Sequence, residues 1–143
     1  MREILFRGKR LQGGNWVEGY FFKSDINKRE RESKKATLIF TPDCDTFIMV
    51  PECHNSFMVV SDTVGQYTGL KDKHGKRIFE GDVAKVLQGK DKDIAYVGFE
   101  NGAVMLYPKT GNIYERTLWE YWYNDWDVEV IGNITDNPEL LEK

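Results

Sequence analysis

The chain has 143 residues, of which 41% are hydrophobic and 30% charged, which is the composition of an ordinary globular domain. Its 20 Lys and Arg against 23 Asp and Glu give a net charge of −3, which excludes a broadly basic protein that coats nucleic acid. The apolar runs, such as Phe47–Val50 and Phe57–Val60, are far shorter than the roughly 20 residues of a membrane-spanning helix. We therefore expect no membrane partner.

The N-terminal residues and the cysteines both favour a cytoplasmic location. Met1–Arg7 contains neither the apolar core nor the small-residue cleavage site of a signal peptide, so we expect a protein that is not exported. The two cysteines, Cys44 and Cys53, make no disulfide framework and are expected to be free thiols.

Short β-favouring runs begin the chain. Ile4–Lys9 and Trp16–Phe22 flank the turn formers Gly13-Gly14-Asn15 and are predicted to form an antiparallel hairpin. A charged loop is predicted at 24–35, because Lys28–Lys35 contains no apolar side chain whose burial would offset the entropy of ordering.

Three further runs complete the first half. Ala36–Thr41 and Thr46–Val50 are predicted to form a strand pair, and Phe57–Val60 is predicted to be another short strand. We assign residues 1–62 to a small antiparallel β subdomain with uncertain strand partners.

The second half, residues 63–143, is predicted to be an SH3-like β-barrel packed with the first subdomain into one compact unit. Closure of a barrel removes the exposed edges that a small open sheet leaves. The most legible turn is Asn101-Gly102, because a type I′ turn needs two positive φ values. The predicted strands are Val64–Thr68, Arg77–Phe79, Val83–Leu87, Ile94–Glu100 and Ala103–Tyr107.

Short helical turns are predicted near the C-terminus of this mainly β chain. Thr117 and Glu120 have the spacing of a capping box, although the aromatic residues that follow Thr117 also suit a strand. Val128–Ile131 returns to strand alternation. Asn137 before Pro138 is typical of a helix N-cap, which predicts a terminal helical turn.

Three segments, Ile4–Arg7, Gln66–Val83 and Val130–Leu141, together resemble the YopX family of phage and prophage proteins, and Trp16–Gly19 is similar to the family's second segment. The resemblance implies a phage or prophage origin, a bacterial host and a β-rich fold with an SH3-type barrel. It implies no activity, because the family is uncharacterised, and it supplies no site residues. Residues 24–63 match no family pattern.

The middle segment has a structural interpretation and a functional one. Structurally, its glycines suit turns, Asp72 and Asp82 can accept hydrogen bonds from nearby amides, and Ile78 and Val83 point to a core. Functionally, an aromatic and basic rim would contact phosphate groups. The members of that rim are Tyr67, Lys71, Lys73, His74, Lys76 and Arg77.

No catalytic residue, cofactor or metal ligand is assigned. A zinc site at Cys44, Cys53 and His54 with Asp43 or Asp45 lacks the usual close ligand pair. A metal on Asp72, His74 and Asp82 requires two turns to converge. A carboxylate enzyme would draw on Glu18, Glu80, Asp82 and Glu120, whose separations the sequence does not set.

An aromatic segment near the C-terminus is the strongest binding candidate. Trp and Tyr are enriched in interface cores, and so many in thirteen residues are difficult to fit into one small core. Core packing is the first interpretation of these residues and a protein interface the second, whereas the acidic surroundings disfavour the third, base stacking. The candidate interface residues are Trp119, Tyr121, Trp122, Tyr123 and Trp126, close to Tyr114.

Charge is divided between the two ends of the chain. Residues 1–35 have ten basic and five acidic side chains, whereas residues 115–143 have two basic and eight acidic ones. The ends attract each other within one chain or between two copies. We expect a non-catalytic binding or adaptor module that forms a homo-oligomer and contacts an unknown phage or host protein. The alternatives are a nucleic-acid-binding barrel and a small carboxylate-based enzyme.

Overall fold

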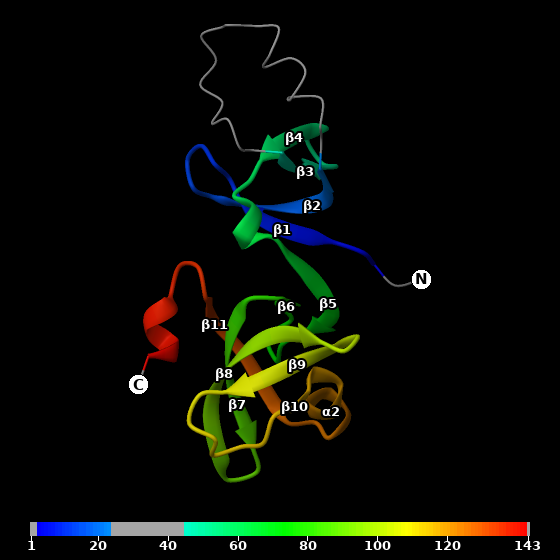
Figure 1. Cartoon of the computed structure of the whole chain (residues 1–143). Coiled ribbons are helices and arrows are strands. Elements are labelled where there is room, and N and C mark those ends of the chain that lie inside the picture. Colours follow the sequence, from blue (N-terminus) through cyan, green and yellow to red (C-terminus); the bar gives the residue numbers. More distant parts are fainter. Residues whose placement is uncertain (1–2, 24–44, 143) are drawn as a thin grey trace, which may run out of the picture. The chain divides into compact units, whose positions relative to one another are not determined.

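The computed structural model describes residues 3–23 and 45–142, which belong to two compact units (Figure 1). The first unit comprises Glu3–Gln66 and the second contains Tyr67–Lys143. The predicted loop at 24–35, the predicted strand Ala36–Thr41 and Cys44 lie outside the described residues. Both units are built mainly from antiparallel strands, which confirms the predicted fold class.

The first unit is an antiparallel sheet in the order β4-β3-β2-β1, and β1 also pairs with the start of β5. The predicted N-terminal hairpin is confirmed, because Lys9 at the end of β1 lies opposite Trp16 at the start of β2. The elements are β1 (Phe6–Lys9), β2 (Trp16–Lys23), β3 (Thr46–Val50), β4 (Asn55–Met58), the 3-10 turn η1 (Ser61–Thr63) and the first residues of β5 (Gly65–Lys71).

One strand of this unit differs from its prediction. The strand is Asn55–Met58 rather than Phe57–Val60, and Val59 makes only an isolated bridge with Arg10. The reason is the β3–β4 turn, in which His54 has a φ of 55° and Asn55 pairs at once with Val50. Pairing register therefore starts this strand two polar residues before its apolar run.

Close backbone approach explains a glycine in the small sheet. A Cβ at Gly19 of β2 would lie 2.0 Å from the carbonyl oxygen of Met49 in β3, so no larger residue fits without a shift of the backbone. Ile48 and Val59 are buried nearby in the same unit.

The second unit is built around a five-stranded antiparallel sheet in the order β10-β9-β8-β7-β11, beside the pair β5–β6. Every strand predicted after residue 63 is present, most with longer ends. The fold is consistent with the predicted SH3-like barrel. Closure of the barrel is not confirmed, because the two edge strands of the sheet do not pair with each other. The strands of this unit that follow β5 are β6 (Arg77–Phe79), β7 (Asp82–Gln88), β8 (Asp91–Glu100), β9 (Ala103–Pro108), β10 (Arg116–Thr117) and β11 (Asp127–Asn133).

Local turn signals account for the ends of several elements. Asn101 and Gly102 have φ values of 51° and 81°, as a type I′ hairpin turn requires. Thr117 accepts a hydrogen bond from the Glu120 amide at 3.3 Å, which confirms the capping box at the start of helix α2 (Leu118–Tyr123). No helix of the described residues is long and apolar enough to cross a membrane.

The terminal turn is present as the 3-10 turn η2 (Pro138–Leu141), but its predicted cap is absent. The Asn137 side chain makes no cap hydrogen bond and instead accepts from the Asn133 amide at 3.3 Å. This is possible because Gly132 leaves room, since a Cβ there would lie 2.5 Å from the Asn137 Oδ1. Asn137 therefore fastens the end of β11 rather than the start of the turn.

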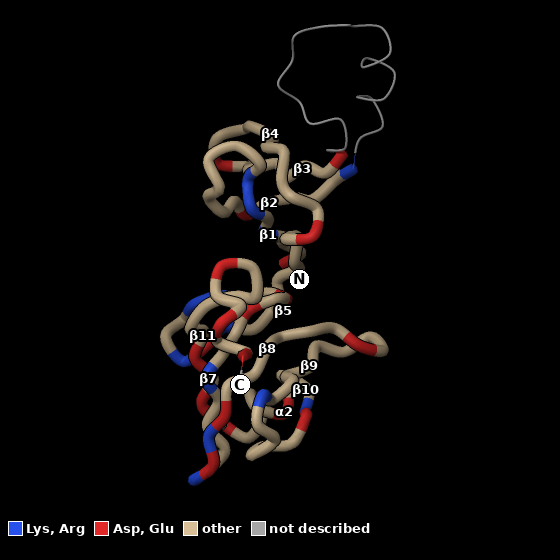
Figure 2. The backbone as a smooth tube through the Cα atoms, turned by 60° about the vertical axis from the view of Figure 1, so that its left-hand side comes forward, with Lys and Arg blue, Asp and Glu red and all other residues tan. Residues whose placement is uncertain are grey.

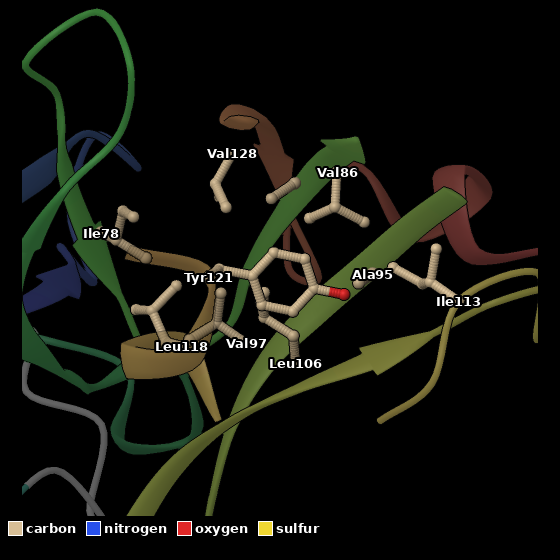
Figure 3. Packing of buried hydrophobic residues seen from close by; sticks show 10 residues of the cluster. Ile78, Val86, Ala95, Val97, Leu106, Ile113, Leu118, Tyr121 and Val128 are labelled. Atoms are coloured by element: carbon tan, nitrogen blue, oxygen red, sulfur yellow. The ribbon is translucent and has the colours of Figure 1, made fainter. Parts of the chain in front are cut away.

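The core of the second unit surrounds Tyr121 of α2. Figure 3 shows its ring among aliphatic side chains that come from the sheet and from α2 itself. The buried cluster consists of Ile78, Ala84, Val86, Ala95, Val97, Leu106, Ile113, Leu118, Tyr121 and Val128. Helix α2 is thus fixed to the sheet by one face, which positions its opposite face.

Candidate functional site

Helix α2 carries large apolar side chains both toward the core and toward solvent, with Glu120 as its one charged residue. Leu118 and Tyr121 are buried in the core, as expected for residues three positions apart on one helix face. Three large aromatic side chains lie on the remainder of the helix, with exposed fractions of 55% for Trp119, 62% for Trp122 and 67% for Tyr123. We call these three residues the α2 aromatic surface. The Trp119 and Tyr123 rings stack with centroids 5.0 Å apart, so they present one joined face.

The chain reverses directly after α2 in a Schellman motif. The Trp126 amide donates to the Tyr121 carbonyl at 3.0 Å, and the Asp125 amide donates to the Trp122 carbonyl at 3.3 Å. This turn puts Asp125 in the left-handed region with a φ of 54°. It also sets the half-buried Trp126 edge-on against Tyr121, with ring centroids 5.2 Å apart.

A pocket of about 240 Å³ lies beside this turn, within the second unit, and we call it the α2 pocket. Trp122 and Trp126 line it from the helix side, and Asp125 and Asp127 line it from the turn. Lys71, Asp72 and Lys73 line it from the end of β5. Its apolar lining consists of Leu70, Ile78, Leu118 and Val128.

Asp72 is the buried carboxylate of the α2 pocket, and both its oxygens are occupied. Oδ1 accepts from the amides of His74 and Lys76 at 2.9 Å, and Oδ2 accepts from the Val130 amide at 3.0 Å. Burial raises the pKa of Asp72, but these three hydrogen bonds and the nearby His74 outweigh burial and bring the pKa below its ordinary value of 3.8. Asp72 is therefore suited to holding the β5–β6 turn against β11, whereas a general acid would need a raised pKa.

The predicted basic rim is divided among several environments. Tyr67 is buried against Phe79, so it offers no exposed ring to a nucleic-acid base. Lys73 and His74 both lie near Glu129, with the Lys73 Nζ 3.5 Å and the His74 Nε2 3.4 Å from its carboxylate oxygens. The Arg77 guanidinium lies 5.8 Å from the centre of the Tyr67 ring, and Lys71 and Lys76 are exposed.

The alternative metal sites are not assembled in the part of the chain that the structure describes. The Asp82 Oδ2 accepts a hydrogen bond from the Phe79 amide at 2.8 Å, and Asp72 accepts from three backbone amides. No group of three His, Cys, Asp or Glu side chains suited to a metal forms among the described residues. Cys53 is exposed, and its proposed partner Cys44 is outside the described range.

The five predicted interface residues differ in how far they are exposed. Trp119, Trp122 and Tyr123 are exposed together, whereas Tyr121 belongs to the core and Trp126 is half-buried. Asp125 and Asp127 of the α2 pocket were not predicted from the sequence. The available signal was the alternation of carboxylates with tryptophan in residues 125–127, directly after an aromatic helix.

Comparisons with known proteins agree with this fold. The crystal structure of protein EF1440 from Enterococcus faecalis is similar, with a TM-score of 0.53 and 21% identity over 99% of this chain and 100% of that chain. None of the curated proteins compared with the chain matches it. The family model described as YopX protein matches residues 5–142. Because that match covers nearly the whole chain, the resemblance noted from the sequence is confirmed, and the chain belongs to the YopX family.

Proposed function

We propose that this YopX protein is a non-catalytic protein-binding module that associates with a second copy of itself through the α2 aromatic surface. One observation carries the proposal: a helix of six residues exposes three large aromatic side chains, each by more than half. An exposed position on a short helix is ordinarily polar, because apolar residues gain nothing from contact with water.

Burying the α2 aromatic surface against a partner stabilises the complex through the hydrophobic effect. Aromatic side chains bury roughly 150–250 Å² each, and burial contributes about 25 cal/mol per Å². The Trp119 and Tyr123 rings already stack on each other, which is an arrangement that a partner can cover as one surface. Trp and Tyr are also the residues in which binding energy concentrates at protein interfaces.

Charge supports a second copy as the partner. Residues 115–143, which contain the α2 aromatic surface, have two basic and eight acidic side chains, whereas residues 1–35 have ten basic and five acidic ones. Figure 2 shows where charged residues lie along the described chain. A second copy brings a basic segment to an acidic one, and reciprocal contact of this kind produces a closed dimer.

Light scattering during gel filtration tests this proposal, at about 0.1 and 1 M salt, a range over which screening removes surface charge attraction. We expect a mass above that of the 16.7 kDa chain at both salt concentrations, because the contact is mainly apolar. A monomer at every loading concentration would overturn the proposal. The same runs with random DNA oligonucleotides test the nucleic-acid alternative, which requires a mass increase at low salt that is lost at high salt.

The adaptor role, in which the module also contacts a phage or host protein, forms part of this proposal. So do the phage or prophage origin and the cytoplasmic location. Their support is membership of the YopX family. Fractionation of cells that express the chain at its native level tests the location, and recovery from the membrane fraction would contradict it.

A further inference from the structure

We propose that the α2 pocket binds an arginine side chain that a second copy of the chain brings to the α2 aromatic surface. This inference rests on the proposed function, because it identifies the chemical group that the partner contributes. The pocket that carries it is lined by two tryptophans, an apolar group of side chains, two lysines and three carboxylates. One carboxylate, Asp72, already accepts three backbone amides, which leaves Asp125 and Asp127 as the candidates for a ligand.

The size of the α2 pocket fits one side chain. Its volume of about 240 Å³ is below the range of about 300–1,000 Å³ that drug-sized ligands occupy. Trp122, which belongs to the α2 aromatic surface, also lines the pocket. A protein that covers the α2 aromatic surface can therefore place one of its side chains in the α2 pocket.

The lining matches the three parts of an arginine side chain. Aliphatic groups of Leu70, Ile78 and Val128 can pack against its methylene stem. The indole faces of Trp122 and Trp126 suit its planar guanidinium, which stacks on aromatic rings. The carboxylates of Asp125 and Asp127 can accept its fork of N–H donors.

The molecule itself contains a precedent for this packing. The Arg116 guanidinium lies 5.7 Å from the centre of the Trp126 ring, and it also pairs with Glu120 at 2.8 Å. A guanidinium held by an indole and a carboxylate is thus already present on Trp126, a residue that also lines the α2 pocket. The α2 pocket offers the same two chemical groups to an arginine from outside.

Asp125 is an unfavourable residue at its position after α2, and binding of a cation there would account for its presence. Glycine is the favoured residue at its left-handed position after a helix, and the nearby helix C-terminus favours a cation over a carboxylate. Asp125 departs from both preferences, and α2 has no basic residue in its last turn. A guanidinium against Asp125 would compensate the unfavourable charge.

The two lysines of the lining do not prevent cation binding. The Lys73 ammonium lies 3.5 Å from Glu129, so its charge is balanced. Lys71 is exposed and can direct its ammonium group into water. If these lysines determined the ligand instead, the α2 pocket would prefer a carboxylate, and a glutamate derivative tests that outcome.

The test uses the ¹⁵N-labelled full chain and three small probes: the N-acetyl methylamides of arginine, of its neutral isostere citrulline, and of glutamate. We expect arginine to shift the indole N–H signals of Trp122 and Trp126 in a saturable manner, with citrulline and glutamate at least 10-fold weaker. Equal binding of citrulline, or preferred binding of glutamate, would overturn the inference.

Variants separate the pocket from general charge. Asp125→Gly suits the left-handed turn while removing one carboxylate, so it should weaken arginine binding at least 5-fold in a protein that is folded as well as the wild type. Asp127→Asn should have a similar effect. Asp91→Asn, at an exposed carboxylate of β8, is the matched control and should bind like the wild type. Unchanged binding by both pocket variants would contradict the assignment.

The oligomeric state of the same samples distinguishes the two proposals. If the chain self-associates and arginine leaves both indole signals unmoved, the arginine inference fails and the proposed function stands. If the chain is monomeric and arginine binds at the α2 pocket, self-association fails and the ligand class stands. If both hold, arginine should also dissociate the oligomer while citrulline does not.

Discussion

Asp125 has a left-handed backbone conformation, which is unfavourable for an L-residue with a side chain. Its φ of 54° follows from the Schellman turn that ends α2. The left-handed conformation costs roughly 1–2 kcal/mol for an ordinary L-residue, somewhat less for Asp, and little for glycine. The folded protein retains this cost although glycine would remove it, as expected where a side chain serves binding.

Replacing Asp125 by glycine should therefore stabilise the chain. We expect Asp125→Gly to raise the free energy of unfolding by about 1 kcal/mol in urea titrations, because the strained position is relieved. Asp125→Ala is the control and should give no comparable gain, since alanine has the same difficulty in the left-handed region. A glycine variant less stable than the wild type would contradict the account.

Tyr121 presents a second residue-scale cost. Its ring is fully buried, its hydroxyl has no hydrogen-bond partner among the residues that the structure describes, and burial raises the pKa of the phenol. A buried polar group without a partner costs about 1–3 kcal/mol.

Tyr121→Phe should therefore be as stable as the wild type or more stable, by up to about 2 kcal/mol, because it removes that penalty and keeps the ring. Thermal unfolding followed by circular dichroism measures the change. Tyr121→Leu, which removes the ring, should be clearly less stable. A marked loss in the phenylalanine variant would show that the hydroxyl has a bonding role.

At the scale of elements, two buried carboxylates tie loops to the sheet. Asp93, at the start of β8, accepts the Thr110 hydroxyl at 2.7 Å and the Asn112 amide at 3.1 Å, which fixes the loop after β9. Burial raises the pKa of Asp93, but these hydrogen bonds outweigh it and bring the pKa below 3.8, in the same direction as for Asp72. Both groups thus favour folding when they are ionised.

This arrangement predicts acid sensitivity with a defined sign. The folded pKa is lowered, so the stabilisation is complete well above about pH 4 and is lost as the pH falls through the folded value. We expect the melting temperature to drop between pH 5 and 2. Asp93→Asn should be less stable at pH 7 and should lose less on acidification than the wild type. Parallel acid curves for the two proteins would refute this role of Asp93.

Some features of the elements could be predicted from the sequence, and others could not. Asn101-Gly102 and the Thr117 cap were predictable because their interactions lie within a few residues of one another. The start of β4 and the role of Asn137 were not, because pairing register and the room beside Gly132 decide them. The α2 pocket combines residues 70–78 with residues 118–128, a proximity that no local pattern encodes.

For the whole molecule, the described chain forms two β units, and the proposed binding functions both lie in the second. The YopX match and the likeness to the Enterococcus faecalis protein extend over nearly the whole chain. The exposed aromatic segment was predictable at this scale from composition, since six aromatic residues lie within residues 114–126. Which of them entered the core was decided by the way α2 packs on the sheet.

The central claim is that the α2 aromatic surface is an interface, and sedimentation velocity of three proteins tests it most directly. The wild type should sediment as more than one 16.7 kDa chain, and Trp119→Ala/Trp122→Ala should sediment as a monomer. Phe99→Ala, which truncates an aromatic residue of β8 that is 59% exposed, should behave like the wild type. A monomeric wild type, or a double variant that keeps the wild-type mass, would contradict the account.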